Sequence, residues 1–413
     1  MIRATSKRMK DTNPLVWNPF REGYIDNPHK QLSFLREQNP VHKGINGRWM
    51  FFKYEDVKFM LLNPAFETIK LHEQISSKNQ FLDEPKNLNR LSTATSKWLF
   101  FVDPPEHPPV RQLVLKLWNQ YNVRNYIEQV VEETIENIAS KKNVEIVSDF
   151  AVLIPIRIIC KILGVPVEDY RQLRQWAYNF ARTLELFESL NKLLLYDKSA
   201  QEFYEYMEKI VDDKKHNPDD SFISNFLVGN QTLEKPLGGE QLVSVFIILF
   251  FAGIETSIYL IGQSVLHLIQ NPAQTQMLRD DLSLTQRAVE ELIRFSSPLQ
   301  YTPRIVTEDV EIRKQVIKSG ETIMGCVASA NRDPETFKNP EELDFTRKSN
   351  PHLSFGHGLH HCIGAKLARE EMNALLPAFV KRFSKIELDG MKPFQWDTII
   401  TNRGLKQLHV VLD

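Results

Sequence analysis

The stretch over residues 354–370 constrains the chain most, because it places a cysteine where a glycine-rich loop becomes a helix. Cys362 has Gly358 before it and Gly364 after it, and good helix formers follow. Unpaired N–H groups and the positive end of the helix dipole lower the pKa of a thiol and stabilise a thiolate. A thiolate is a preferred ligand of soft and redox metals, and glycine lets the backbone approach a flat ligand closely.

Three kinds of site are compatible with this loop. The first is a buried structural cysteine, since a lone thiol usually packs as a small hydrophobic group. The second is zinc, because His357, His360 and His361 lie beside Cys362, although structural zinc sites usually take two spaced pairs of ligands. The third is haem iron with one axial thiolate.

The order Phe-x-x-Gly-x-x-x-Cys-x-Gly, over residues 355–364, resembles the haem-binding loop of the cytochrome P-450 family. The resemblance implies a mainly α fold, a helical prism with small β-sheets around one buried haem b (iron protoporphyrin IX). It also implies that Cys362 is the iron ligand, that Phe355 packs beside its sulfur, and that Gly356 and Gly364 lie against the cofactor.

The most apolar run, residues 242–262, contains a second motif. The run is long enough to span a membrane, but a central carboxylate such as Glu255 costs about 2.5–3.5 kcal/mol there. We therefore expect a helix at the centre of a soluble core. Gly253 weakens this helix, and Thr256 can turn its hydroxyl to the carbonyl of Ala252 and open a local groove.

The run from 252 to 256 resembles the oxygen-binding motif of the same family. The resemblance implies that Ala252 lies beside the haem, that Thr256 hydrogen-bonds dioxygen or its delivering water, and that Glu255 helps to relay protons. A threonine bonded only to its own backbone is the ordinary alternative, but a carboxylate beside it in an apolar run is uncommon.

His107 and Arg111 are four residues apart, so they face the same way on a helix that we expect to begin near residue 103. Alone, they fit a solvated helix face. Beside the cysteine loop they resemble the His-x-x-x-Arg of bacterial family members, which implies a clamp on the haem propionates together with Arg304 and His352. The two prolines after His107 depart from the family pattern and leave the start of this helix open.

Glu291 and Arg294 share a helix face at a spacing of three residues. Such pairs are common on exposed helix surfaces, but the apolar neighbours of this pair favour its burial. The pair resembles the Glu-x-x-Arg of the family, which implies a structural triad completed by Arg347. Removing one member of a buried triad leaves a charge without its partner, so we expect it to be severe.

The rest of the chain predicts one domain over residues 1–413. Asn46-Gly47 is a strong turn signal for a hairpin. Residues 71–99 are polar with weak periodicity, so we expect a long loop with no more than one short helix. The remainder reads as helical, apart from β-rich parts near residues 41–52, 299–323 and 384–411.

Composition excludes several classes of function. A net charge of −1 provides no global field for nucleic acid or an anionic membrane. Three cysteines form no disulfide framework and fit a reducing cytosol. The start of the chain is polar and basic, without the apolar run of a signal peptide or membrane anchor. We therefore expect a cytoplasmic protein.

The resemblance implies an oxidoreductase, a monooxygenase that inserts one atom of O2 into its substrate by hydroxylation or epoxidation. It implies a monomer that takes electrons from a ferredoxin or flavodoxin with its reductase. Lys116, Lys366 and Arg369 are a candidate docking patch, with solvated surface charge as an equal alternative. A peroxide-driven peroxygenase, which the pair of Glu255 and Thr256 disfavours, and a non-catalytic haem sensor or carrier stay open.

By position, the substrate pocket takes its walls from residues 71–99, residues 183–195, the central helix and the later strands. These walls are mostly apolar with a few hydrogen-bonding groups. They favour a lipophilic small molecule, such as a polyketide, terpenoid, fatty acyl or peptide-derived intermediate of secondary metabolism, free or bound to a carrier protein. The individual residues are Ile248, Phe251, Gln300, Tyr301, Thr302, Ile399 and Ile400.

Overall fold

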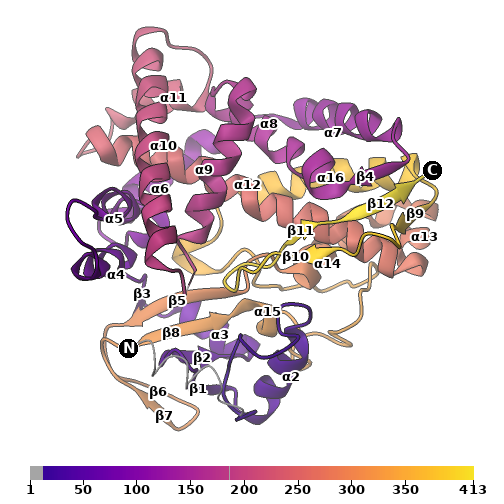
Figure 1. Cartoon of the computed structure of the whole chain (residues 1–413), viewed down its shortest axis with the longest axis horizontal. Helices are drawn as coiled ribbons and strands as arrows, with labels where there is room; N and C mark the ends of the chain where they lie inside the picture. Colours follow the sequence, from indigo (N-terminus) through magenta and orange to yellow (C-terminus); the bar gives the residue numbers. More distant parts are fainter. Residues whose placement is uncertain (1–12, 186) are drawn as a thin grey trace.

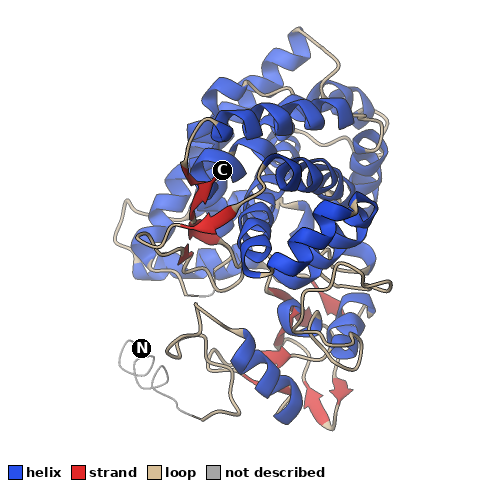
Figure 2. Ribbon diagram, turned by 90° about the vertical axis from the view of Figure 1, so that its right-hand side faces the viewer, coloured by secondary structure: helices blue, strands red, loops and turns tan. Residues whose placement is uncertain are grey.

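The computed structural model describes residues 13–185 and 187–413, arranged as a large helical part and a smaller part built on a β-sheet (Figure 1). The larger part surrounds α12 (Gly239–Gln270). In the smaller part, α2 (His29–Gln38), α3 (Tyr54–Leu62) and α15 (Val327–Ala330) lie beside the sheet. Figure 2 shows that strands also lie at one side of the helical part, near the C-terminus.

Most residues of α12 are apolar, and the helix packs against several neighbouring helices. Among the described residues it is the one helix long and apolar enough to cross a membrane, and 78% of its most apolar stretch is buried inside the protein. A helix that is apolar all round is stable at the centre of a large core. The prediction of a central core helix is therefore confirmed.

The other helices of the larger part enclose α12 from several sides. The helix that follows the cysteine loop, α16, packs against α7, α13 and α14. The bounds are α6 (His107–Trp118), α7 (Arg124–Ala139), α8 (Leu153–Leu163), α9 (Tyr170–Arg182), α10 (Leu190–His216), α11 (Phe222–Asn230), α13 (Pro272–Asp280), α14 (Thr285–Ser296) and α16 (Ala365–Arg382).

The five-stranded sheet has the order β1-β2-β8-β5-β3. Its first two strands, β1 (Val41–Lys43) and β2 (Trp49–Phe51), form the predicted hairpin, and Gly47 in the turn has a φ of 77°. The pairing of β2 with β8 is parallel and the others are antiparallel. The remaining strands are β3 (Phe66–Glu67), β4 (Asn143–Glu145), β5 (Tyr301–Val306), β6 (Val310–Ile312), β7 (Gln315–Ile317), β8 (Thr322–Cys326), β9 (Ile386–Leu388), β10 (Gln395–Trp396), β11 (Leu405–Gln407) and β12 (His409–Leu412).

Residues 71–99 are more helical than the sequence predicts. They form α4 (Leu71–Ser76) and α5 (Asn89–Ser96), with short 3-10 helices after each. Helices of this length are marginal in water on their own, so tertiary contacts must stabilise them. The N–H of Leu91 donates to Asp197 Oδ1 on α10 at 2.8 Å, and Trp98 is fully buried. The expectation of a loop with at most one short helix is wrong for this reason.

The helix that carries His107 begins at that residue, as α6. Its two prolines occupy the first turn, where a backbone N–H has no partner within the helix. The helix thus begins four residues later than the expected start near residue 103, and the prolines are compatible with its first turn. His107 and Arg111 lie one turn apart on α6.

Candidate functional site

Backbone contacts hold the loop that carries Cys362. The N–H of Cys362 donates to the carbonyl oxygen of Phe355 at 2.9 Å and closes the loop. Gly356 and Gly358 each have a φ of 69°, which glycine adopts without strain. A Cβ on Gly358 would lie 2.9 Å from the carbonyl oxygen of Leu61. The end of α3 therefore packs directly on the loop.

Cys362 is exposed, although many protein atoms surround its thiol. Burial raises its pKa, and the N–H groups of Gly364 and Ala365, with attraction from Arg111, offset this only in part. The helix start thus lowers the pKa of the thiol, as the sequence predicts, but desolvation outweighs this effect. No three His, Cys, Asp or Glu side chains gather to hold a metal in the part of the chain described, so the zinc alternative has no support.

One face of α12 is exposed near the middle of the helix, although most of the helix is buried. Ala252 and Thr256 are exposed, one turn apart on one face, whereas Phe251, Ile254 and Glu255 are buried. Thr256 Oγ1 donates to the carbonyl oxygen of Ala252 at 3.0 Å, in the geometry that the sequence predicts. The helix thus presents a hydroxyl and a small side chain on an accessible face inside an otherwise packed core.

Glu255 turns into the protein beside this face. Burial raises its pKa to about 7, Arg174 and Tyr259 lower it, and Asp397 adds to the rise. Its Oε1 has no hydrogen-bond partner among the described residues. A carboxyl group in this state can release and take back a proton near neutral pH.

The two histidines predicted at the haem propionates are buried and short of partners. Both ring nitrogens of His107 lack a hydrogen-bond partner within residues 13–185 and 187–413, and burial lowers the pKa of the ring to about 4. His352 Nδ1 also lacks one, whereas its Nε2 lies 3.1 Å from Glu290 Oε2. These nitrogens are therefore available to a ligand.

The two arginines predicted beside them differ in burial, since Arg304 is buried and Arg111 is half-buried. Arg304 is buried, and its hydrogen bonds go to Thr302 Oγ1 at 3.2 Å and the carbonyl oxygen of Pro303 at 2.8 Å. It forms no ion pair within the described chain. Arg111 donates to the carbonyl oxygen of His361 in the cysteine loop. A buried guanidinium without a carboxylate is costly, so the two carboxylates of haem b fit this set of donors.

Glu291, Arg294 and Arg347 form a triad of ion pairs. Arg294 Nη2 lies 2.7 Å from Glu291 Oε1, and Arg347 Nε lies 3.0 Å from Glu291 Oε2. The Glu291 and Arg294 side chains are completely buried. Arg294 also donates to the carbonyl oxygens of Asn331 and Pro340. The triad thereby ties α14 to the segment that leads into the cysteine loop.

Arg369, the third residue of the candidate docking patch, is half-exposed and paired with a carboxylate, so its charge is less free for a partner than that of the two lysines. It donates to both carboxylate oxygens of Glu290, at 2.6 and 3.0 Å, and its guanidinium lies 4.6 Å from the ring centre of Phe355. Lys116 and Lys366 are exposed, as the patch requires. No local pattern points to Glu290 as the partner of Arg369, because the two residues are 79 positions apart.

Aromatic rings from distant segments meet at Phe251. Its ring centre lies 4.9 Å from that of Trp98, 5.7 Å from Phe180 and 6.0 Å from Phe100. α12, α9 and the segment after α5 therefore contribute to one apolar wall. Of the other predicted pocket residues, Ile248, Gln300 and Ile399 are buried and Thr302 is half-buried.

Tyr301 and Ile400 pack in an apolar cluster with Trp17 and not in the predicted pocket wall. The hydroxyl of Tyr301 accepts a hydrogen bond from Trp17 Nε1 at 2.9 Å and is also bonded to Tyr24. Ile400 packs in the same apolar cluster. Successive side chains of a strand point to opposite faces, so Tyr301 points away from the face of its neighbour Thr302. We therefore leave Tyr301 and Ile400 out of the pocket.

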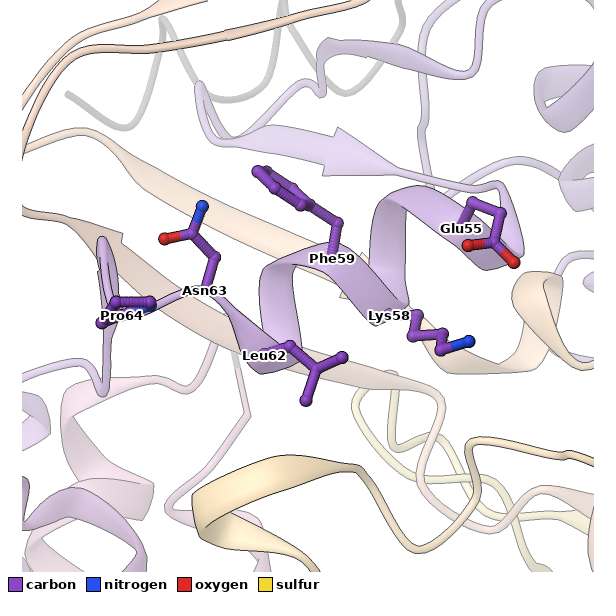
Figure 3. Close-up of a pocket in the computed structure, with 6 residues that line it drawn as sticks. All are labelled: Glu55, Lys58, Phe59, Leu62, Asn63 and Pro64. Atoms are coloured by element: carbon purple, nitrogen blue, oxygen red, sulfur yellow. The ribbon is translucent and has the colours of Figure 1, made fainter.

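A shallow depression runs along the surface of α3, beside the cysteine loop. Figure 3 shows Phe59 and Leu62 standing out from the helix there. These two side chains are 41% and 51% exposed, and Leu359 of the cysteine loop is 42% exposed. Large apolar side chains gathered on a surface indicate a contact site. The depression is lined by Glu55, Lys58, Phe59, Leu62, Asn63 and Pro64.

Comparisons with known proteins agree with this site. A model of the family described as Cytochrome P450 matches residues 48–403. The biotin biosynthesis cytochrome P450 of Bacillus subtilis (strain 168) is 32% identical over 396 residues, covering 94% of this chain and 97% of that protein. The polyketide biosynthesis cytochrome P450 PksS of the same organism is 31% identical over 412 residues, covering 96% and 99%.

A solved structure is similar over the same length. The crystal structure of P450BioI in complex with hexadec-9Z-enoic acid ligated acyl carrier protein has a TM-score of 0.86 at 31% identity, covering 94% of this chain and 99% of that one. This likeness confirms the predicted mainly α fold with small sheets. The chain belongs to the cytochrome P450 family, whose members are monooxygenases that use haem b bound through a cysteine thiolate.

Proposed function

We propose that this protein inserts one oxygen atom from O2 into a lipophilic biosynthetic intermediate that carries an acyl chain. The overall reaction is R–H + O2 + two electrons + two protons, giving R–OH and water. The observation that carries the proposal is the accessible hydroxyl of Thr256 beside the buried acid Glu255 on α12. An O2-dependent reaction needs protons at the reacting oxygen, and this pair is placed to supply them.

When bound, haem b supplies the redox chemistry that activates oxygen. Cys362 would hold its iron through the thiolate at the start of α16. His107, Arg111, Arg304 and His352 would hold its two propionates, because their buried and half-buried donors have no carboxylate partner among the residues that the structure describes except at His352, which contacts Glu290. The two carboxylates would thus satisfy groups that are otherwise costly to bury.

Thr256 and Glu255 divide the handling of protons between them. Thr256 donates to the carbonyl oxygen of Ala252, so its oxygen can accept a hydrogen bond from a water on the accessible face. Glu255, with its pKa near neutrality, stores one proton next to that water. The apolar wall around Phe251 keeps bulk water from the same space and orients an apolar substrate.

The relatives favour an acyl substrate. Two of them are named for biotin and polyketide biosynthesis, and the similar structure of P450BioI was solved with acyl carrier protein ligated to hexadec-9Z-enoic acid. The ring cluster of Phe251, Trp98 and Phe180 suits a hydrocarbon chain. We propose a fatty acyl or polyketide chain, presented free or on a carrier protein, ahead of terpenoid and peptide-derived compounds.

A direct experiment compares free long-chain fatty acids with the same acyl groups on an acyl carrier protein. The reduced holoprotein should first show the CO absorption of a thiolate-ligated haem. Acyl compounds should then shift the ferric spin state, and turnover under 18O2 should place one labelled atom in the product. Absence of both a shift and a product with every acyl compound would refute the substrate class.

The same holoprotein distinguishes the O2-dependent enzyme from two other functions. A peroxygenase would form product with hydrogen peroxide as fast as with reductant and O2, and Thr256→Ala would leave its coupling intact. A sensor or carrier would show the spectral shift with no product. The presence of Glu255 beside Thr256 favours the O2-dependent enzyme, since that reaction consumes two protons whereas the peroxide reaction and a carrier consume none.

Electrons would come from a separate ferredoxin or flavodoxin with its reductase. The docking surface we propose combines exposed Lys116 and Lys366 with Phe59, Leu62 and Leu359 beside the cysteine loop (Figure 3). Cations attract an acidic carrier, and apolar side chains bury area once contact is made. The three unpaired cysteines suit a reducing cytoplasm as the place of this reaction.

Charge reversal tests this docking surface. Lys116→Glu with Lys366→Glu should raise the KM for the electron donor and weaken its dependence on ionic strength, while leaving the substrate spin shift unchanged. Lys381→Glu, at the other end of α16, is the matched control. Equal KM values for the double variant and the control would remove the lysines from the docking surface.

A further inference from the structure

A buried row of polar side chains leads from Glu255 across to α9. Tyr259 lies one turn after Glu255 on α12, so both stand on the same side of the helix. The Tyr259 hydroxyl lies 3.3 Å from Oδ2 of Asp397, the residue that follows β10. Arg182, at the end of α9, donates from Nη1 to the other oxygen of Asp397 at 3.0 Å. All four side chains are buried.

The position of the Tyr259 ring is fixed by the connection between β10 and β11. A Cβ on Gly404 would lie 1.8 Å from Tyr259 Cδ1, so the ring packs against bare backbone that no other residue could provide. The carbonyl oxygen of Gly404 accepts from the N–H of Asp397 at 2.9 Å. The same turn therefore holds both the ring and the carboxylate that its hydroxyl contacts.

Tyr259 has one proton to donate and two carboxyl groups within its surroundings. Burial, with Glu255 and Asp397 nearby, raises the pKa of Tyr259, so the phenol stays protonated. When Glu255 is protonated, the phenol donates to Asp397, which Arg182 holds in place. When Glu255 is ionised, its charge competes for the same proton, because a hydrogen bond to a buried anion is worth more than one to a neutral acid.

We propose that Tyr259 and Asp397 are positioning residues for Glu255. The Tyr259 hydroxyl donates its hydrogen bond to Glu255 when Glu255 has given up its proton, and it donates to Asp397 again when Glu255 is reprotonated. No proton leaves the phenol, and only its O–H bond rotates. The role rests on the proposed function, in which Glu255 supplies protons. It explains why Oε1 of that acid has no fixed partner in the described chain.

Tyr259 and Asp397 have opposite effects on the pKa of Glu255. α9 contributes Arg174, whose charge lowers the pKa of Glu255, and the segment after β10 contributes Asp397, whose charge raises it. On α12 itself, the hydrogen bond from Tyr259 lowers it. Tyr259 therefore stabilises the ionised acid after it has released a proton, and Asp397 favours its return.

The test is the titration of Glu255 in the substrate-free ferric holoenzyme, followed by infrared spectroscopy. The carboxylic-acid C=O band of Glu255 is assigned as the one that disappears in Glu255→Gln. Tyr259→Phe removes the stabilising hydroxyl and should raise the midpoint of this band by about one pH unit. Asp397→Asn removes a repelling charge and frees the hydroxyl, so it should lower the midpoint.

Tyr178→Phe is the matched control. The Tyr178 hydroxyl also lies 3.3 Å from Asp397 Oδ2, but it stands on α9 and is absent from the groups that act on Glu255. Its removal should move the midpoint by less than a third of the Tyr259→Phe shift. Equal shifts in the two phenylalanine variants, or shifts of Tyr259→Phe and Asp397→Asn in the same direction, would overturn the proposal. Where Asp397→Asn fails to fold, the two phenylalanine variants decide alone.

Turnover separates this inference from the function on which it rests. Tyr259→Phe should increase the share of electrons lost as hydrogen peroxide at least threefold. It should also increase the solvent kinetic isotope effect on turnover, with the KM for substrate unchanged. If Glu255→Gln leaves coupling as in the parent, the proposed role of Glu255 fails, whatever the infrared result. If Glu255→Gln uncouples but Tyr259→Phe shifts neither the band nor the coupling, the function stands and the positioning role is refuted.

Discussion

Replacing Glu291 by glutamine removes a charge at the point where α14 meets the segment before the cysteine loop. The carboxylate accepts hydrogen bonds from Arg294 at 2.7 and 2.8 Å and from Arg347 at 3.0 Å. It also accepts from Asn350 Nδ2 at 3.1 Å and from the N–H of Asp344 at 3.0 Å. Glutamine keeps the shape but replaces one acceptor oxygen by a donor and leaves two cations without an anion.

The expected loss is large because the ion pairs are almost completely shielded from water. Glu291 and Arg294 have no exposed side-chain surface, and Arg347 has 7%. Breaking a buried ion pair on one side costs about 3–5 kcal/mol. The matched control is Glu133→Gln, since Glu133 pairs with Arg157 at 2.6 Å but is 48% exposed. An exposed pair of this kind contributes about 0–1 kcal/mol.

The assay is urea denaturation of the holoprotein followed by far-UV circular dichroism at one fixed haem concentration, because haem binding itself adds to stability. In the Glu291→Gln background, adding Arg347→Met should recover part of the lost stability, whereas Arg347→Met alone should destabilise. A cost within 1 kcal/mol of the Glu133→Gln control would contradict the reasoning that burial makes this triad costly to break.

Three further predictions concern the cofactor, the sheet and pH. Cys362→Ala should abolish the CO absorption of a thiolate-ligated haem; a retained band would exclude Cys362 as the ligand. Tyr301→Phe should cost about 1 kcal/mol, since its hydroxyl bonds Trp17 and Tyr24, and should leave substrate spin shifts unchanged; altered substrate affinity would return Tyr301 to the pocket. Burial raises the pKa of Glu371 to about 8, so its contribution to stability is full below about pH 4.3 and is lost as the pH rises through 8. Glu371→Gln should therefore match the parent at pH 4 and exceed it in urea stability at pH 8; a constant difference across pH would refute the assignment.

Sequence reasoning succeeded where the chemistry is local. The spacing of Glu291 and Arg294 places them on one helix face, and the structure joins them in an ion pair. Thr256 bonds the carbonyl oxygen one turn back for the same reason. In each case the helix alone determines which atoms meet. The fold class could be predicted because a long apolar run and a glycine-rich cysteine loop carry the resemblance to the family.

The parts that sequence reasoning missed depend on contacts between distant segments. The partner of Arg369 is Glu290 on another helix, and Tyr259 meets Asp397 across 138 positions. The direction of Tyr301 follows from the face that its strand presents, which a one-residue shift in register would reverse. α5 forms because Asp197 on α10 binds the N–H of its residue Leu91. None of these follows from spacing or propensity along the chain.

The unpartnered groups also bear on what the chain needs in order to be stable. His107 is buried with two nitrogens unsatisfied in the described structure, and Arg304 is buried there without an ion pair. Each unsatisfied buried group costs about 1–3 kcal/mol, more when charged, and a whole protein is stable by only about 5–15 kcal/mol. Such groups use up a large share of that stability unless a ligand binds to them, and the two propionates of haem b would satisfy both. The same donors that would orient the cofactor therefore make the folded state depend on it, since a ligand that binds only the native chain adds its binding free energy to stability.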